Sequence, residues 1–230
     1  MAEILIVDDE RVLREGMKAR LQAEGYDVRT AKDGDDALVK IAERAPDLVL
    51  LDVMMPKTNG FRCCEAIRKT NALLPIVFLT AKDAEGDQVR GLGLGADDYV
   101  SKSAPESVLL ARIGAALERT ERFGANVTVA KAKRLLIGPV EVDRQTFAVL
   151  LDGKAIATLT KTEADVLAYL FRRRGELVLI DDIIAGLRGS GYACEDSMVY
   201  AHVSRLRRKL GPAGALVRNI RRAGYTLLPA

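Results

Sequence analysis

"LVLLDVMMPKTNG", residues 48–60, joins a short apolar run to a single acid and then to a turn. Residues 48–51 have the length and composition of a strand that is buried on both faces of a sheet. The run stops at Asp52, and Pro56 and Gly60 then mark a turn. A lone acid at a strand end usually caps a neighbouring group or faces water. The role of Asp52 therefore depends on the groups that other strands bring beside it.

Apolar runs of the same kind recur through the first half of the chain. They cover residues 3–7, 26–28, 47–51, 75–79 and 98–100. Each run is followed by a segment with helical spacing of apolar residues, which after the first run are Val12, Leu13, Met17 and Leu21. Strands that alternate with helices predict an α/β fold, in which helices cover both faces of a doubly wound parallel sheet of five strands.

Polar side chains follow four of these five runs. They are Asp8 with Asp9, then Asp52, Thr80 and Lys102. Because ligands of such sheets bind at the carboxyl ends of the strands, we expect these side chains to share one rim. Three carboxylates in one place repel each other unless a cation joins them, and a few hard oxygen ligands suit Mg²⁺. Asp52 would then act as a nucleophile toward phosphorus, with Thr80 and Lys102 stabilising the phosphoryl oxygens.

The composition is that of a globular protein with room for two domains. Of its 230 residues, 49% are hydrophobic and 29% are charged. No apolar run approaches the roughly 20 residues that span a bilayer, and the first residues lack the basic segment of a secretory signal. We therefore expect a cytoplasmic protein that does not use a membrane. Cys63, Cys64 and Cys194 have no metal-ligand spacing and are expected to be small buried thiols.

The net charge of +3 hides a difference between the two halves of the chain. Residues 1–120 contain 17 Lys and Arg against 21 Asp and Glu, whereas the remainder contains 18 against 11. No acid follows Asp196, although seven basic residues do: Arg205, Arg207, Arg208, Lys209, Arg218, Arg221 and Arg222. A basic tail of this kind predicts a C-terminal domain that binds phosphate groups.

The second half changes from alternating strands and helices to several short strands followed by helices. Asp152-Gly153 is a strong hairpin signal, so we expect a small antiparallel sheet around it. Thr160 and Glu163 have the spacing of a capping box and predict the start of a helix. Two further helices are expected to begin near Asp181 and Asp196.

The last of these helices, "EDSMVYAHVSRLRRKLG" at residues 195–211, has two contrasting faces. Its buried stripe is predicted to consist of Val199, Val203, Leu206 and Leu210. The opposite face is predicted to carry Ser197, Ala201, Ser204, Arg205 and Arg208, flanked by Tyr200 and Arg207 on one side and by His202 and Lys209 on the other. A small, hydroxylated, Arg-rich face without acids suits the major groove of DNA.

The second hairpin adds to that interpretation, and the histidine of the helix limits the alternatives. Arg221 and Arg222 lie at the turn of a second hairpin, which is able to reach a minor groove or phosphates. His202 is the one histidine of the chain, so a metal cluster or a catalytic triad built on histidine is excluded. Phosphate contact and simple packing both remain open for it.

In the first half, "VDDE", "LDVMMPKTNG", "LTAK" and "GADDYVSK" resemble the receiver domain of a bacterial two-component response regulator. The resemblance implies a (βα)₅ fold in which Asp52 accepts a phosphoryl group from a sensor histidine kinase. It also implies that Asp8, Asp9, Asp52 and the Met54 carbonyl hold Mg²⁺, and that Thr80 and Tyr99 form a switch pair. Such a receiver assists its own phosphorylation and dephosphorylation and is otherwise not an enzyme.

In the second half, "LTKTEADVLAYL", "HVSRLRRKLG" and "IRRAGYTL" resemble the winged helix-turn-helix domain of OmpR/PhoB-type transcription factors. The implied DNA-binding residues are Ala201, His202, Ser204, Arg205, Arg207, Arg208, Arg221 and Arg222. Among them Arg205 and Ala201 would read bases, while His202 and Arg207 would touch phosphates. The implied domains are a receiver at 1–120, a linker at 121–127 and a winged-helix domain at 128–230.

The resemblance also implies partners. They are the histidine kinase, double-stranded promoter DNA and a second copy of the chain after activation, with RNA polymerase as a further candidate. Asp97, Asp98, Arg112 and Arg119 match the charges of the family's receiver dimer face. Gln88 and Val108 replace a Lys and a Glu that usually pair there, which predicts weaker dimerisation.

The residues after Lys102 also depart from the family pattern. Ser103 and Ala104 stand where members usually have Pro-Phe after a cis bond. A cis bond before a residue other than proline costs about 3–4 kcal/mol. Either the Lys102–Ser103 bond is trans and the lysine sits differently, or strain is retained at this site.

Three other functions are consistent with parts of the sequence. A regulator that binds DNA without phosphorylation of Asp52 is one, because the surroundings of Lys102 are altered. A metal-dependent phosphatase is another, although it would need a second carboxylate where Met54 stands. The third is a protein-interaction module with an incidental basic tail.

Overall fold

The structure is a computed structural model of the chain that describes residues 1–56, 58–80, 94–125, 134–188, 196–221 and 223–229, with the side chains of 118–125, 187, 188, 196 and 197 excepted. The chain divides into two compact units, Met1–Glu118 and Arg119–Ala230. Among the described residues, no helix combines the length and the apolar character needed to cross a membrane.

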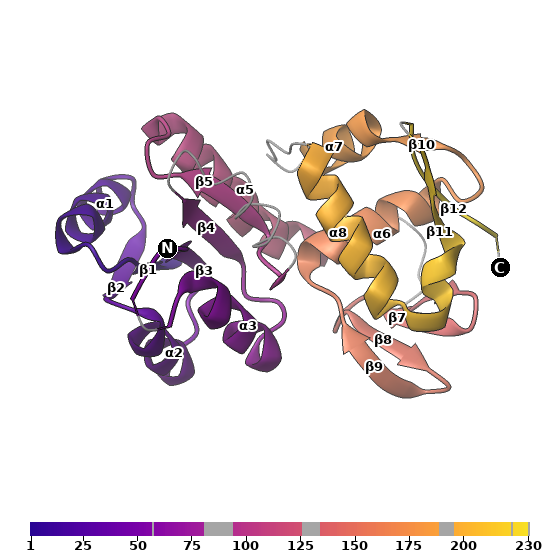
Figure 1. Cartoon of the computed structure of the whole chain (residues 1–230), viewed down its shortest axis with the longest axis horizontal. Coiled ribbons are helices and arrows are strands. Elements are labelled where there is room, and N and C mark those ends of the chain that lie inside the picture. Colours follow the sequence, from indigo (N-terminus) through magenta and orange to yellow (C-terminus); the bar gives the residue numbers. More distant parts are fainter. Residues whose placement is uncertain (57, 81–93, 126–133, 189–195, 222, 230) are drawn as a thin grey trace. The chain divides into compact units, whose positions relative to one another are not determined.

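The first unit is built on a five-stranded parallel sheet with the strand order β2-β1-β3-β4-β5 (Figure 1). The strands are β1 (Glu3–Val7), β2 (Asp27–Ala31), β3 (Leu48–Asp52), β4 (Ile76–Thr80) and β5 (Asp98–Ser101). The bounds of all five differ from the predicted runs by three residues or fewer, so the predicted doubly wound α/β fold is confirmed. The residues of β3 and β4 are buried throughout, as expected for strands covered on both faces.

Helices pack on both faces of this sheet. They are α1 (Arg11–Ala23), α2 (Gly34–Glu43), α3 (Gly60–Thr70) and α5 (Glu106–Ala125). α1 and α5 supply Leu21, Ile113 and Ala116 to the core over one face. α2 and α3 lie together on the other face (Figure 1). This wrapping leaves the strand ends as the accessible edge of the sheet.

The turn after Asp52 brings α3 back against the end of β3. Asn59 caps α3 by accepting a hydrogen bond from the backbone N–H of Arg62. The backbone N–H of Gly60 donates to the carbonyl oxygen of Val53 at 3.1 Å. A Cβ at position 60 would lie 2.1 Å from the Asp52 carbonyl oxygen, so only glycine fits there. The turn is therefore built to hold Asp52 in place.

The described part of the second unit combines two antiparallel sheets with three α-helices. The first sheet has the order β6-β7-β8-β9, with β6 (Arg134–Ile137), β7 (Val140–Asp143), β8 (Ala148–Leu151) and β9 (Lys154–Thr158). Asp152 and Gly153 both adopt positive φ values between β8 and β9, as a tight hairpin requires. The predicted hairpin is therefore confirmed.

The helices of the second unit are α6 (Lys161–Arg172), α7 (Ile180–Arg188) and α8 (Asp196–Lys209). The predicted capping box of Thr160 and Glu163 is present at the start of α6. After α8 come a 3₁₀ turn, η1 (Gly211–Leu216), and the strands β11 (Val217–Ile220) and β12 (Gly224–Leu227). These two strands and β10 (Val178–Leu179) form the second sheet.

The predicted linker at 121–127 begins inside α5, which continues to Ala125. Residues 126 and 127 lie outside the described part of the chain. The exact extent of the linker therefore stays a prediction.

Candidate functional site

Three carboxylates meet at the carboxyl edge of the parallel sheet. Asp8 and Asp9 follow β1 directly, and Asp52 ends β3, the neighbouring strand. One ligand oxygen from each lies within 4.8 Å of the others. Asp8 and Asp52 are buried, whereas Asp9 is exposed. The ends of β1 and β3 therefore bring the three carboxylates together, as predicted, and the exposed Asp9 opens the cluster to solvent on one side.

Lys102 joins the same group from the end of β5. Its Nζ lies 2.8 Å from Asp8 Oδ2 and 2.9 Å from Asp52 Oδ2. Its backbone N–H donates to the carbonyl oxygen of Thr80 at 2.8 Å, which fixes the lysine beside the end of β4. We call Asp8, Asp9, Asp52 and Lys102 the strand-end pocket.

The structure also answers the question raised by Ser103. The described residues contain no cis peptide bond, so Lys102–Ser103 is trans. The Ser103 hydroxyl lies 2.9 Å from that of Ser101, and its backbone N–H also points to Ser101. The lysine still reaches both carboxylates, so a proline after it is not needed for this contact.

Burial and charge act in opposite directions on the pocket. Burial raises the pKa of Asp52, while the hydrogen bond and charge of Lys102 lower it and the nearby Asp8 raises it again. Burial disfavours the Lys102 ammonium, but hydrogen bonds to Asp8 and Asp52 outweigh it, so the lysine pKa is raised. Lys102 therefore stays charged and keeps at least part of the negative charge compensated.

The donor set fits a hard divalent cation. Three carboxylates against one ammonium leave excess negative charge in the pocket. All the available ligand atoms are oxygens, which suit magnesium. Met54 is held next to Asp52 because its backbone N–H donates to Asp52 Oδ1 at 3.3 Å, and its side chain points to solvent with 70% exposure.

The two residues assigned as a switch pair lie on the neighbouring strands β4 and β5. Thr80 ends β4 and is buried, and Tyr99 in β5 is buried as well. The Arg112 guanidinium lies 5.8 Å from the centre of the Tyr99 ring. Tyr99 is thus turned inward and held on one side by α5.

The two acids assigned to a dimer face, Asp97 and Asp98, are buried in the first unit and paired with arginines of the same chain. Asp97 is 4% exposed and accepts from Arg68 at 2.7 Å, and Asp98 is 1% exposed and accepts from Arg112 at 2.6 Å. Asp97 also accepts the backbone N–H of Ile76 at 3.0 Å, which ties it to β4. The Arg119 side chain and Gln88 lie outside the described residues.

In the second unit, α8 buries its predicted apolar stripe. Val199, Val203, Leu206 and Leu210 are all inaccessible to solvent, which confirms the stripe. The expected exposure of Arg205, however, is wrong, because Arg205 is only 3% exposed. His202 is 0% exposed, which fits the packing role that the sequence left open for it. Both residues face the interior of the unit.

A charged group from α6 explains this burial. Glu163 Oε1 lies 3.2 Å from Arg205 Nε, and Glu163 Oε2 lies 2.7 Å from Lys209 Nζ. Arg205 Nη2 is 2.5 Å from Nδ1 of His202. Arginine is always charged and a buried charge needs partners, so α8 turns Arg205 toward Glu163. We call Glu163, His202, Arg205 and Lys209 the Glu163 cluster.

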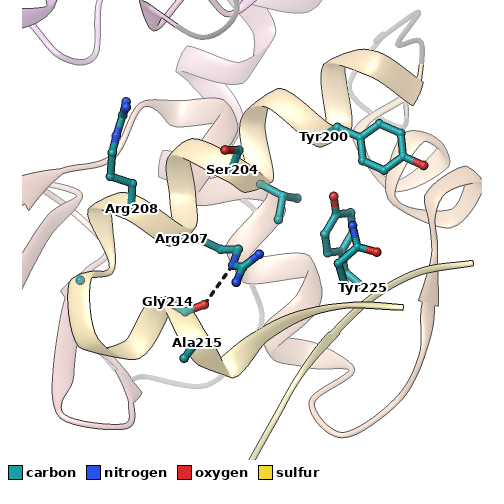
Figure 2. Close-up of a pocket in the computed structure, with 10 residues that line it drawn as sticks. Tyr200, Ser204, Arg207, Arg208, Gly214, Ala215 and Tyr225 are labelled. Atoms are coloured by element: carbon teal, nitrogen blue, oxygen red, sulfur yellow. Dashed lines mark hydrogen bonds between the residues drawn. The ribbon is translucent and has the colours of Figure 1, made fainter. Parts of the chain in front are cut away.

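The outer face of α8 is therefore different from the predicted one. It carries Tyr200, Ser204, Arg207 and Arg208, while Ala201 is half-buried at its margin. The four exposed side chains, without Ala201, border a pocket of about 570 Å³ that η1 and Tyr225 of β12 complete (Figure 2). Arg207 Nε donates to the carbonyl oxygen of Gly214 at 3.3 Å, which holds its guanidinium at the pocket.

The predicted contact face of α8 had Tyr200 on one flank and did not include Tyr225 or Asn219. The spacing of Tyr200, Ser204 and Arg207 or Arg208 was a usable signal, because residues three and four apart share a helix face. At the second hairpin, Arg218 and Arg221 are exposed, and Arg222 lies outside the described residues.

The fold and the strand-end pocket define a class of protein, a receiver joined to a winged-helix domain. Residues 4–114 match the response regulator receiver domain family. Residues 153–227 match the family described as transcriptional regulatory protein, C terminal.

Full-length relatives place the chain more narrowly. It is 34% identical to the alkaline phosphatase synthesis transcriptional regulatory protein PhoP of Bacillus subtilis, over 98% of this chain and 96% of that protein. It is also 34% identical to the phosphate regulon transcriptional regulatory protein PhoB of Rhizobium meliloti, over 99% of both. The solved structure of a RitR mutant has a TM-score of 0.81 over 99% of both chains, and at 24% identity it shows the shared fold.

The chain belongs to the OmpR/PhoB family of two-component response regulators. It is a phosphorylation-dependent transcriptional regulator that binds DNA.

Proposed function

We propose that Asp52 is the phosphoacceptor and that a sensor histidine kinase is the donor. The observation that carries this proposal is the strand-end pocket, in which Lys102 lies within 2.9 Å of a carboxylate oxygen on both Asp8 and Asp52. Asp8, Asp9, Asp52 and the carbonyl of Met54 would hold Mg²⁺. When bound, this ion supplies positive charge to the phosphoryl oxygens.

The chain's own residues then have separate roles in the transfer. A carboxylate oxygen of Asp52 attacks phosphorus and forms the new P–O bond, while the P–N bond to the donor imidazole breaks and that nitrogen takes a proton. Lys102 offers a fixed positive charge to the incoming phosphoryl oxygens, and the Thr80 hydroxyl donates a hydrogen bond. The receiver assists its own phosphorylation and dephosphorylation in this way. Thr80 and Tyr99 pass the new charge on as the switch pair.

The output is control of promoter DNA binding. The exposed side chains of Ser204, Arg207 and Arg208 on α8 face the major groove, with Ala201 at its margin, and Arg221 and Arg222 of the hairpin meet the minor groove or phosphates. Arg205 and His202 support α8 from inside and are left out of this contact surface because they are buried. The regulator acts in the cytoplasm, and RNA polymerase is its further partner at the promoter.

Phosphorylation promotes a homodimer of receivers that is weaker than in typical relatives. Val108 offers no charge to a second copy, and the pairs Arg68–Asp97 and Arg112–Asp98 hold their charges within one chain. Arg112 must leave Asp98, and Arg119 must be available, before either arginine can join a second receiver. Sedimentation with and without beryllofluoride measures this: a dimer as tight as that of typical relatives would contradict it.

One experiment tests the two domains together. The full chain is treated with a small phosphodonor and Mg²⁺, and its labelling and its gel shift of genomic fragments are measured beside those of Asp52→Asn. We expect one labile phosphoryl group per chain and tighter DNA binding, both lost in Asp52→Asn. Asp27→Asn is the matched control, because Asp27 is exposed at the start of β2, and it should behave as the wild type. Equal DNA binding by labelled and unlabelled protein would contradict the proposed control of DNA binding through Asp52.

A further inference from the structure

The exposed face of α8 contains an aromatic side chain that the DNA surface described above does not use. Tyr200 is 41% exposed, although most of the large side chains nearby on this helix are buried or charged. Its ring centre lies 6.3 Å from that of Tyr225, at an interplanar angle of 62°. This edge-on arrangement is a favourable one for aromatic rings. Figure 2 shows the Tyr200 ring beside the Tyr225 ring at the pocket.

Tyr225 is a firm support for the Tyr200 ring. It is buried in β12, where it lines the pocket together with Asn219 of β11. The Tyr200 ring is thus held between its own helix and the second hairpin. A tyrosine side chain has only two rotatable bonds, so holding it in one orientation requires little further loss of conformational entropy.

The Glu163 cluster determines that Tyr200 points outward. Arg205 is anchored to Glu163 on the inner side of α8, and this contact sets the rotation of the helix about its axis. Residues four apart share a helix face, so Tyr200 and Ser204 both project on the outer side. Arg207 lies three residues beyond Ser204, and its guanidinium binds the carbonyl oxygen of Gly214. The N-terminal part of the outer face is therefore formed by Tyr200 and Ser204.

We propose that Tyr200 is a specificity-determining residue, which contacts base edges in the major groove beside Ser204. This inference rests on the proposed DNA binding of α8 and adds a part of the recognition to it. The face of the ring packs against the methyl group of a thymine, and the hydroxyl hydrogen-bonds the edge of the same or the next base pair. Apolar contact with the thymine methyl is one of the ways in which side chains distinguish bases.

The test selects preferred sequences from a random pool of double-stranded DNA. The full-length wild type, Tyr200→Phe, Tyr200→Ala and Arg208→Ala are compared after treatment with the same phosphodonor. For Tyr200→Ala we expect discrimination to fall about tenfold at one or two neighbouring positions, the size of one good base contact. Its affinity for unrelated DNA should stay within about twofold, because the tyrosine carries no charge to release counterions. Tyr200→Phe keeps the aromatic pair and should keep the thymine preference while losing the part due to the hydroxyl.

Arg208→Ala is the matched control on the same face. It should weaken binding to all sequences because a positive charge is lost, and it should leave the preference at the positions assigned to Tyr200 unchanged. The same preferred sequence for wild type and Tyr200→Ala would overturn the inference. A wild type that binds DNA without any sequence preference would contradict the proposed function itself, and so the two failures can be told apart.

Discussion

The strand-end pocket and the Glu163 cluster are built from the same kinds of side chain, yet they differ in charge balance and in access to solvent. The pocket has three carboxylates and one ammonium, and Asp9 is exposed. The Glu163 cluster has one carboxylate between two cations, and Glu163 is buried completely. Negative charge left unbalanced and within reach can bind a cation or attack a phosphoryl group. A charge that is paired and enclosed can only position the elements that carry it.

This difference gives buried ion pairs two separate uses in one chain. Removing charges from water is costly, so a buried pair adds little net stability, but it penalises every arrangement in which the partners are apart. In the second unit the penalty keeps α8 in one rotation against α6. In the receiver, Lys102 keeps Asp8 and Asp52 close together without neutralising all their charge.

The largest expected effect comes from a substitution that breaks the Glu163 cluster. Glu163→Ala leaves Arg205 buried without its carboxylate and also removes the capping box of α6. The free energy of unfolding of the second unit should therefore fall by about 3–5 kcal/mol, as when one partner of a buried pair is deleted. Hydrogen exchange of the α8 amides in the full chain measures it. The exposed Glu176 supplies the control Glu176→Ala, and a loss for Glu163→Ala as small as for that control would refute the role given to the cluster.

A smaller effect is expected from the same kind of change in the strand-end pocket. Asp8→Asn removes one of three anionic ligands, so the affinity for Mg²⁺ should fall at least about tenfold, equivalent to about 1.4 kcal/mol. The unit should stay folded because Lys102 still has Asp52 as a partner. Calorimetric titration with Mg²⁺ measures the change, with Asp27→Asn as the control. Unchanged affinity would mean that Asp8 is not a ligand.

The smallest effect concerns the stability of the receiver and its dependence on pH. Burial raises the pKa of Asp52, so the folded state binds its proton more tightly than the unfolded state does. Ionisation of Asp52 therefore costs stability as the pH rises through that raised pKa. Asp52→Asn should be more stable than the wild type at neutral pH, and its advantage should shrink as the pH falls through the pKa of Asp52. Thermal unfolding of both proteins at several pH values tests this, and an Asn variant that is less stable at neutral pH would contradict it.

Much of the receiver was predictable because its rules are local or topological. Apolar runs at residues 48–51 and 75–79 are long enough for buried strands, and parallel strands must end at one edge. Asp8, Asp9, Asp52 and Lys102 could therefore be placed together before any coordinates were known. The burial of Asp97 could not be predicted in this way, because it depends on Arg68, an arginine of α3 that is far from Asp97 in the sequence.

The face of α8 was predicted only in part. Each residue turns the helix by roughly 100°, so the apolar residues locate the centre of the buried side but not its width. The buried side extends past Leu206 to His202 and Arg205 because Glu163 meets them there. Lys209 and Glu163 are 46 residues apart in the sequence. The periodicity of α8 therefore could not predict that Glu163 is the partner of Lys209.

The amino-acid sequence alone determined the two-domain class, the strand-end pocket and the apolar stripe of α8, since short-range patterns and the geometry of a parallel sheet are sufficient for them. Tertiary structure decided which charges remain available. Whether a charged side chain faces solvent or an interior partner depends on the free energy of desolvation at that place, and only the packed elements around it set that free energy.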